Sequence, residues 1–360
     1  MTQITHHGVD ASSIQPHRAP TTSYRIGAQF TRFPGTETTP LRQGIATALE
    51  QGYTSITLNN FALESRDTDV VELRGAARDI ASSGSELLLG LGSAGPVQEA
   101  RTARAELAAT LAAGLDLGCT EYFLHTRTER TTVRHGERTL DHPAQLSQIL
   151  HTLGSLHPVA AAAGARLNLK THEDLSSAEV KQVIDRLDPE VFGIGLDVAN
   201  LVVRGEDPVK VTRALAPQVR STHLEDLVLF PIDTGYRRRL CPIGQGVLPW
   251  DEILGSLWAQ GVRTFTIEQH RGRFDTPVHN RAWFENEPHL HPDDLGQLAR
   301  MARATTALVE GGQIPELERW NDDPSATERA EQFAASAAYL RRALQNLSST
   351  TVDDSTQSGR

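Results

Sequence analysis

Residues 165–200 read ARLNLKTHEDLSSAEVKQVIDRLDPEVFGIGLDVAN, and this stretch contains the pattern that decides the fold. Its apolar runs, at 165 and 192, are short and rich in Leu, Ile or Val, as expected of strands buried on both faces. Between them, Ser176 and Glu179 have the spacing of a capping box at a helix start. The stretch therefore predicts a strand, a helix and a second strand.

The same alternation extends outward in both directions. Further apolar runs are YRIGAQF at 24, YTSITLNNF at 53, ELLLGLGS at 86, CTEYFLHT at 119, VRSTHLED at 219 and RTFTIEQH at 263. Amphipathic stretches such as TPLRQGIATALEQG lie between them and end at glycines suited to helix C-caps. Strand then helix, eight times over residues 24–312, predicts an α/β fold: a closed (β/α)8 TIM barrel. The alternative, a doubly wound open sheet, is disfavoured because GAQFTRFPG contains no GxGxxG fingerprint.

Outside the barrel we expect one more helix and two flexible tails. The barrel is assigned to residues 23–320 and a C-terminal helix to 321–347, where Ser325 and Glu328 form a capping-box pattern. Its apolar stripe would cover the barrel or a second subunit; it comprises Phe333, Ala337, Leu340 and Leu344. Residues 1–22 and 348–360 are polar without an apolar period, so we expect disordered ends.

Composition excludes several classes of protein. The 360 residues include 45 acidic and 35 basic side chains, giving a net charge of -10, and only 5% are aromatic, which argues against a nucleic-acid partner. No stretch approaches the ~18 apolar residues of a membrane span, and the first thirty residues lack a signal-peptide core. The two cysteines, Cys119 and Cys241, stand apart. We therefore expect a cytoplasmic protein without a membrane partner.

Four successive strands end in ionisable side chains. Lys170 and His172 lie at the end of the fifth strand, and Asp197 lies at the end of the sixth. His223 lies at the end of the seventh strand and Glu268 at the end of the eighth. Active sites of TIM barrels lie at the C-terminal ends of the strands. Side chains alternate along a strand, so small residues lie below these ionisable ones on the same face. We expect the four strand ends to form one site.

Asp197, His223 and Glu268, with His172 as a fourth ligand, predict a divalent metal site. Imidazole and carboxylate ligands without a thiolate suit Mn²⁺, the ion we expect first, and also Mg²⁺, Co²⁺, Fe²⁺ or Zn²⁺. A metal would also neutralise carboxylates that are otherwise costly to bury side by side. The alternative for each residue alone is a structural, hydrogen-bonded side chain.

In their order along the chain, GIGLDVAN, THLED, CPIGQGVLPWDEIL and TIEQH resemble the xylose isomerase-like TIM barrel superfamily, which includes sugar phosphate isomerases and epimerases. The resemblance implies that Asp197, His223 and Glu268 are three of four metal ligands. Epimerases of this group normally carry a glutamate where this chain has Lys170. Three interpretations remain: His172 supplies the fourth ligand, Lys170 acts as acid or base with a lowered pKa, or Lys170 fills the metal position and leaves a binding protein.

LKTHED also resembles superfamily members that cleave oxidised sugars, namely 3-oxo-isoapionate decarboxylases and the catalytic subunits that split 3-oxo-C-glycosides. We therefore expect a metal-dependent isomerase or epimerase that acts on a keto-sugar through a metal-stabilised enediolate. The alternatives are a lyase on an oxidised sugar and a non-catalytic sugar-binding barrel. A DNA-repair endonuclease is disfavoured by the net charge. The partners that we expect for this chain are a small-molecule keto-sugar and either a second copy of the chain or a small partner subunit.

Further candidates surround the expected site. Lys170, His172, His125 and His270 are predicted acids or bases, with solvated histidines as the alternative. Arg127, Trp283 and the arginines at 237–239, chiefly Arg237 and Arg239, are predicted to bind substrate, although such arginines often form solvated ion pairs. Residues 270–294 form a long segment without a regular pattern, which could be a lid or a subunit contact.

Overall fold

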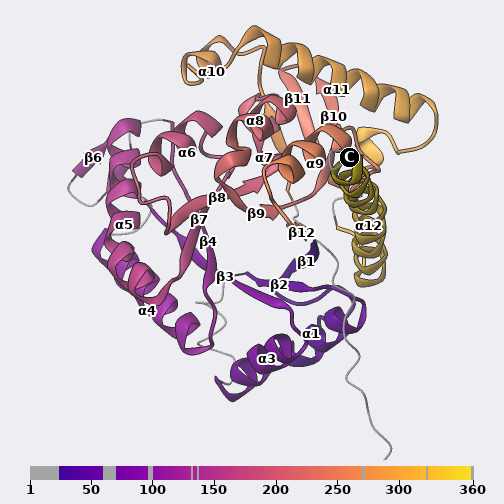
Figure 1. Ribbon diagram of the computed structural model, residues 1–360. Helices are drawn as coiled ribbons and strands as arrows, with labels where there is room; N and C mark the ends of the chain where they lie inside the picture. The colour runs from indigo at the N-terminus through magenta and orange to yellow at the C-terminus, as the bar shows by residue number, and fades with distance from the viewer. Residues whose placement is uncertain are drawn as a thin grey trace, which may run out of the picture.

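The computed structural model describes residues 24–59, 70–95, 100–130, 133–135, 138–269, 272–321 and 323–357. Eight strands form one parallel sheet in the order β12-β1-β2-β3-β4-β7-β8-β9 (Figure 1). Each matches a predicted apolar run, so the TIM barrel is confirmed. The strands are β1 (Arg25–Phe30), β2 (Ser55–Leu58), β3 (Glu86–Ser93), β4 (Glu121–His125), β7 (Arg166–Lys170), β8 (Phe192–Asp197), β9 (Val219–His223) and β12 (Thr264–Ile267).

The barrel closes between β9 and β12 through a parallel bridge that pairs Leu224 with Ile267. The amide of Leu224 donates to the Thr266 carbonyl at 2.8 Å, and the amide of Glu268 donates to the Leu224 carbonyl at 3.1 Å. This closure lies at the C-terminal ends of both strands. It therefore brings the residues that follow β9 next to those that follow β12.

Helices surround the barrel (Figure 1). They are α1 (Leu41–Glu50), α3 (Val70–Ser82), α4 (Ala100–Asp116), α5 (His142–Ala163), α6 (Ser177–Ile184), α7 (Val198–Leu201), α8 (Pro208–Leu215), α9 (Trp250–Ala259), α10 (Arg281–Glu285), α11 (Pro292–Glu310) and α12 (Ala326–Gln357). Single 3-10 turns are η1 (Val202–Arg204), η2 (Ala216–Gln218) and η3 (Leu317–Arg319). The predicted capping box opens α6, where the Ser176 amide donates to Glu179 Oε2 at 2.8 Å.

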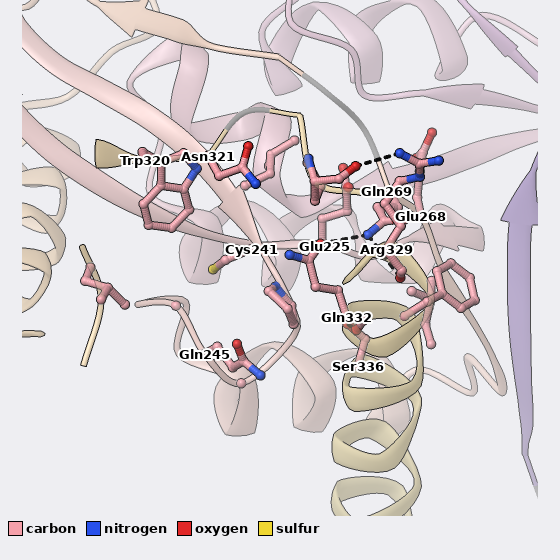
Figure 2. Close-up of a pocket in the computed structure, with 18 of the residues that line it drawn as sticks. Glu225, Cys241, Gln245, Glu268, Gln269, Trp320, Asn321, Arg329, Gln332 and Ser336 are labelled. Atoms are coloured by element: carbon pink, nitrogen blue, oxygen red, sulfur yellow. Dashed lines mark hydrogen bonds between the residues drawn. The ribbon is translucent and has the colours of Figure 1, made fainter. Parts of the chain in front are cut away.

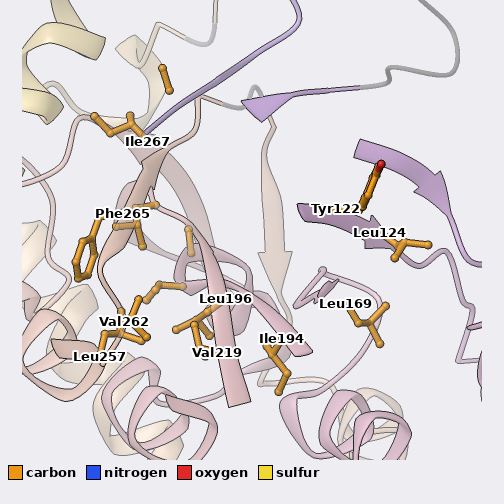
Figure 3. Close-up of a cluster of buried hydrophobic side chains, with 14 of the residues drawn as sticks. Tyr122, Leu124, Leu169, Ile194, Leu196, Val219, Leu257, Val262, Phe265 and Ile267 are labelled. Atoms are coloured by element: carbon orange, nitrogen blue, oxygen red, sulfur yellow. The ribbon is translucent and has the colours of Figure 1, made fainter. Parts of the chain in front are cut away.

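The apolar core lies between the sheet and the helices (Figure 3). On β8, Ile194 and Leu196 are fully buried in this layer. The alternate residue Gly195 faces the interior of the barrel, because a Cβ atom built on it would lie 3.1 Å from both Ser221 Oγ and His223 Nε2. The two-residue alternation therefore separates the core from the polar mouth, and Asp197 follows Gly195 on the interior face.

Two antiparallel sheets were not expected from the sequence. Strands β10 (Asp226–Ile232), β11 (Gly235–Cys241) and β13 (Phe274–Thr276) form one, and β5 (Val133–His135) with β6 (Arg138–Leu140) forms the other. The prediction that residues 270–294 lack regular structure is therefore wrong, since they include β13, α10 and the start of α11. A three-residue edge strand such as β13 forms by pairing with β11, and its own sequence is too short to show a period.

Helix α12 packs against its own barrel. All four residues of its predicted apolar stripe are buried, and the ring of Phe333 lies 5.7 Å from Phe33 and 5.5 Å from Tyr53. The helix continues to Gln357, so the expectation of a disordered tail from 348 is wrong for most of that segment. Between Ala326 and Gly359 the sequence has no glycine or proline, so no helix-breaking residue ends α12 earlier. Residues 1–22 lie outside the described residues.

In the part of the chain that the structure describes, no helix has the length and apolar character needed to cross a membrane.

Asp226, at the start of β10, organises the loop that follows β11. Its side chain is completely buried, and it accepts hydrogen bonds at 2.7–3.2 Å from five donors: the amides of Leu227, Gly244, Gly246 and Leu248 and the indole of Trp250. A Cβ atom on Gly246 would lie 2.3 Å from Asp226 Oδ1, so glycine is required for this approach. Gly244 and Gly246, the two glycines of this loop, therefore serve backbone geometry.

We expect Asp226→Asn to lower the free energy of unfolding by about 3 kcal/mol, because the amide nitrogen would face N–H donors and leave them unsatisfied. Urea denaturation would measure this loss. Asp116→Asn, at an exposed site near the end of α4, is the control and should change stability by less than about 0.5 kcal/mol. Equal effects of the two substitutions would contradict the assigned role of Asp226.

Candidate active site

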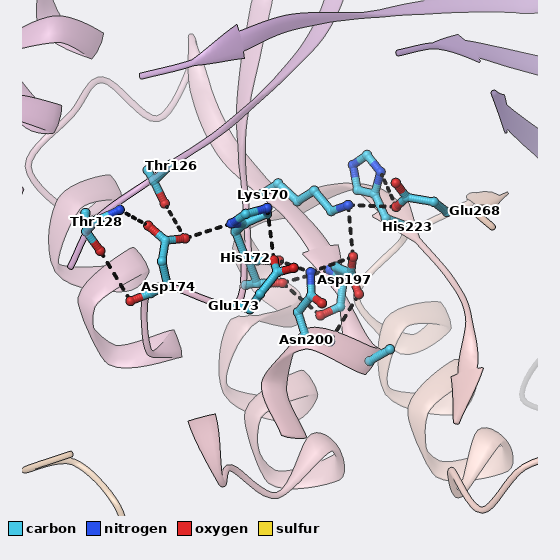
Figure 4. Close-up of polar contacts among 12 residues, drawn as sticks. Thr126, Thr128, Lys170, His172, Glu173, Asp174, Asp197, Asn200, His223 and Glu268 are labelled. Carbon is cyan, nitrogen blue, oxygen red and sulfur yellow. Dashed lines mark hydrogen bonds and ion pairs between the residues drawn. The ribbon is translucent and has the colours of Figure 1, made fainter. Parts of the chain in front are cut away.

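A buried ion cluster lies at the C-terminal mouth of the barrel (Figure 4). The ammonium of Lys170, at the end of β7, lies 2.9 Å from Asp197 Oδ2 and 2.7 Å from Glu268 Oε2. All three side chains are at most 4% exposed. The predicted convergence of these strand ends is therefore present, but the lysine itself lies between the two carboxylates.

The electrostatics of Lys170 favour its charged form. Burial by itself lowers the pKa of an ammonium, but the charges of Glu268 and Asp197 and their hydrogen bonds outweigh burial and raise the pKa of Lys170 above its ordinary value. The side chain thus carries a positive charge at neutral pH. In this structure the pKa of Lys170 is raised, and its role as an acid or base with a pKa lowered by a neighbouring metal ion stays a prediction.

Asp197 is held by the residues that follow it. The amide of Asn200 donates to Asp197 Oδ1 at 3.2 Å, and the Asn200 side chain donates to Oδ2 at 2.9 Å. Buried Arg238 from β11 in turn donates to Asn200 Oδ1 at 2.8 Å. Sequence reasoning did not identify Asn200. The available signal was its position three residues after Asp197, where a backbone amide can donate to the side chain of an N-cap aspartate.

Glu268 and His223 share a second missed residue, Gln29 of β1. The Gln29 amide nitrogen donates to Glu268 Oε1 at 2.6 Å, and its oxygen contacts Nδ1 of His223. The same imidazole nitrogen lies 3.5 Å from Glu268 Oε2. Burial is the main cause that lowers the pKa of His223, so its ring is neutral. In YRIGAQF, the two-residue spacing of Gln29 from Gly27 was the available signal.

These residues do not fit a metal ion as they stand. No group of three or more His, Cys, Asp or Glu side chains among the described residues is arranged to hold one. The Lys170 ammonium occupies the position between the two carboxylates, and a second cation there would be repelled. His223 Nε2 is buried without a hydrogen-bond partner, but one nitrogen does not outweigh that charge. The expected Mn²⁺ centre is therefore not assembled.

His172, the predicted fourth ligand, is paired with two carboxylates in this structure. Its Nδ1 pairs with Asp174 at 2.8 Å and its Nε2 with Glu173 at 2.9 Å, so both nitrogens are engaged. Asp174 is fixed by Thr126 Oγ1 at 3.0 Å and by the Thr128 amide at 2.6 Å. The acidic residues of LKTHED thus hold the imidazole beside the ion cluster (Figure 4).

His125 and His172 form a pair with opposite pKa shifts. Their rings lie 5.3 Å apart. Burial, followed by the charge of His172, lowers the pKa of His125 to about 4. Burial also opposes the charge of His172, but its bonds to Asp174 and Glu173 raise the pKa of His172 to about 9. At neutral pH the pair therefore comprises one neutral ring and one imidazolium, the arrangement of a base and an acid.

The remaining candidates are at different places, and the charge of Arg127 acts on His125. Arg127 is exposed, and Arg237 forms a two-pronged ion pair with Asp275 at 2.7 and 2.8 Å on the small sheet. Arg239 is buried on the same strand. Trp283 packs over Gly205, because a Cβ atom there would lie 3.0 Å from its ring. The structure does not bring Arg237 or Trp283 to the cluster, and His270 lies outside the described residues.

A cavity of about 570 Å³ borders the cluster (Figure 2). Glu268 lines it, together with Glu225, which follows β9, and Gln269, which follows β12. Residues of the C-terminal segment line the other side, including Trp320 and Gln332. Its volume is within the range of small-molecule sites, and it has both polar and apolar walls. A ligand in this cavity would touch Glu268.

Comparison with known proteins identifies the family. The model of the xylose isomerase-like TIM barrel family matches residues 45–300. The chain belongs to this family. The predicted resemblance is therefore confirmed.

Three curated relatives match over short segments. An uncharacterized protein YihM of Escherichia coli is 25% identical over 116 residues, which cover 32% of this chain and 36% of that protein. The 3-oxo-isoapionate decarboxylase of Pectobacterium atrosepticum is 30% identical over 90 residues, or 24% and 33% of the two chains. Inosose dehydratase 1 of Bacillus cereus is 25% identical over 125 residues, or 30% and 40%. The chain thus matches about a third of each relative's length.

Solved structures agree in fold. A D-psicose 3-epimerase studied with D-fructose has a TM-score of 0.54 at 14% identity, covering 80% of this chain and 98% of that one. The IOLI protein, which holds a zinc atom, has a TM-score of 0.53 at 14% identity over 81% and 100%. A Mycobacterium smegmatis barrel in complex with magnesium has a TM-score of 0.53 at 17% identity over 78% and 98%. Some structural relatives therefore bind metals.

We expect millimolar MnCl₂ to leave the melting temperature of the protein unchanged, since Lys170 already supplies the charge. Lys170→Ala should lose about 3–5 kcal/mol of stability by leaving two buried carboxylates unpaired, and MnCl₂ should then raise its melting temperature. Differential scanning fluorimetry measures both effects. The control is Lys181→Ala, which removes an exposed pair with Asp185. A rise in the melting temperature of the unmodified protein with MnCl₂ would argue for a metal site.

For the histidine pair, we expect NMR titration of the ring signals to give a pKa of about 9 for His172 and about 4 for His125. Because the folded pKa of His172 is raised, its ion pairs stabilise the fold fully below pH ~6.5 and are lost as the pH rises through about 9. His172→Gln assigns the signal and removes this pH dependence. Titration of His172 near its ordinary value would refute the pairing with Glu173 and Asp174.

Proposed function

We propose that this chain is an enzyme of carbohydrate metabolism, a lyase that acts on an oxidised sugar or keto-cyclitol. The observation that carries the proposal is the buried ammonium of Lys170, held by Asp197 and Glu268 beside a cavity of sugar-binding size. Reactions next to a ketone are accelerated by a hydrogen-bond donor or a positive group where negative charge develops on the ketone oxygen. In this proposal Lys170 supplies that group in place of a metal.

The reacting groups follow from the geometry. Glu268 belongs both to the ion cluster and to the cavity wall, so its carboxylate is placed to take a proton from the carbon next to the ketone. The electron pair left on that carbon forms an enolate, whose oxygen accepts a hydrogen bond from Lys170. The group on the neighbouring carbon then leaves and takes up the proton that Glu268 has abstracted, so that the carboxylate is regenerated.

The relatives favour a lyase over the predicted isomerase or epimerase. The name of one relative describes a decarboxylase of a 3-oxo sugar acid, and that of another a dehydratase of an inosose. Both names describe the loss of a group from a ketone-bearing molecule. Because epimerases among the structural neighbours share less than 25% identity with this chain, they support the fold alone. The metal that IOLI holds is not carried over, because 14% identity supports the fold alone and Lys170 already lies between Asp197 and Glu268 in this chain.

A non-catalytic sugar-binding barrel is the second candidate. The observation in its favour is that Lys170 and both carboxylates satisfy one another within the described cluster. A binder would take up ligand without any change in its carbon skeleton. Turnover of a sugar substrate therefore distinguishes the lyase from the sugar-binding protein.

Incubation of the purified protein with scyllo-inosose and with 3-oxo-D-glucose in D₂O, followed by NMR and mass spectrometry, tests the proposal. We expect loss of water or of another substituent, and we expect the rate to be unchanged by EDTA. Lys170→Met should reduce the rate at least about 100-fold, in line with the loss of one oxyanion-stabilising group.

Lys181→Met is the matched control, because it removes an exposed ammonium and should keep full activity. Inhibition by EDTA that is reversed by Mn²⁺ would contradict the role of Lys170. Deuterium uptake with an intact carbon skeleton and substituents would identify an isomerase or epimerase instead. Binding without any turnover would support the sugar-binding candidate.

A further inference from the structure

Half of the residues that line the cavity next to Glu268 lie outside the family match. The family model ends at residue 300, whereas half of the lining residues lie between 308 and 336. They come from the end of α11, from the connection that contains η3, and from the first turns of α12. The cavity therefore lies where the segment that follows the family match meets the barrel.

The walls of the cavity are fixed by contacts between the barrel loop and α12. The Ile243 amide donates to Ser336 Oγ at 3.0 Å, and Ser336 donates to the Gln332 carbonyl at 3.0 Å. Gly244 has φ of +85°, and a Cβ atom on it would lie 2.2 Å from the ring of Tyr339. The loop can approach the helix this closely only with glycine. The cavity is thus preformed, and binding does not require it to be assembled.

The cavity lining has a polar part and an apolar part. Glu225, Glu268 and Gln269 are polar groups near the mouth of the barrel, whereas Trp320 and Ile314 are apolar groups of the connection between α11 and α12. Figure 2 shows Trp320 and Asn321 on one side of Glu225 and Glu268, with Gln332 and Ser336 on α12. The ring of Phe230 holds the Trp320 indole edge-on at 5.7 Å. Such a site suits a ligand with a hydroxylated part and an apolar part.

We infer that this cavity is a subsite for an aromatic or apolar substituent on the sugar, and that Trp320 is its stacking surface. The inference rests on the proposed function, which places the sugar ring at Glu268. A volume of about 570 Å³ leaves room for a second ring beyond the sugar, and the indole of Trp320 in the cavity wall is an aromatic group against which that ring can pack. The preferred substrate is therefore an oxidised sugar that carries an aromatic or apolar substituent.

Isothermal titration calorimetry with phenyl β-D-glucopyranoside and methyl β-D-glucopyranoside tests this inference, because the two probes differ only in the aglycone. The phenyl compound should bind at least about tenfold more tightly than the methyl compound. Trp320→Ala should abolish the difference, and Trp320→Phe should retain most of it. Gln332→Trp, which fills the cavity, should weaken binding of the phenyl compound and leave the methyl compound unchanged.

Equal binding of the two glycosides by the unmodified protein, or no detectable binding of the phenyl compound, would overturn the subsite. A preference that persists in both Trp320→Ala and Gln332→Trp would do so as well. These measurements need no turnover, so they separate from the test of the proposed function. If the protein is an active lyase but does not prefer the phenyl compound, only the subsite is refuted. If it prefers the phenyl compound but is inactive, only the proposed lyase activity is refuted.

Discussion

The site depends on one electrostatic constraint: two carboxylates buried at the barrel mouth need a positive charge between them. Asp197 and Glu268 are on strands β8 and β12, and neither could stay ionised at almost zero exposure without compensation. Lys170 supplies that charge from β7. Because the ammonium is covalently part of the chain, the compensation is present whenever the protein is folded. The cluster therefore does not depend on the supply of any ion.

This constraint links strands that are distant in sequence. Gln29 of β1 bridges Glu268 and His223, so the polar network continues across the closure of the barrel. On the other side, Asn200 connects Asp197 to Arg238 of the small antiparallel sheet. In a buried network, losing one member leaves its partners unsatisfied, so the positions of the reacting groups are mutually fixed. The small antiparallel sheet therefore contributes to the site through Arg238, although Arg238 does not line the cavity.

Much of this arrangement follows from local sequence. Alternation and length identify the eight strands, and the strand ends predict that Asp197, His223 and Glu268 converge, since parallel strands present their C-terminal ends together. The role of Lys170 could not be derived in the same way, because it depends on the distance between β7 and β12 across the barrel and on the side-chain rotamer. The strand β13 and the cavity were missed for a similar reason: both exist only through pairing and packing of segments far apart in the chain.

An ammonium and a divalent metal are different electrophiles, and the difference bears on the reaction. A metal can bind a ketone and a neighbouring hydroxyl oxygen together, which suits proton transfer between adjacent carbons. An ammonium has three directional hydrogens, and Asp197 and Glu268 accept two of those of Lys170. One hydrogen remains for a single substrate oxygen. A site of this kind can stabilise one enolate oxygen but cannot chelate two oxygens, so it is better suited to expelling a neighbouring group than to moving a carbonyl along the sugar.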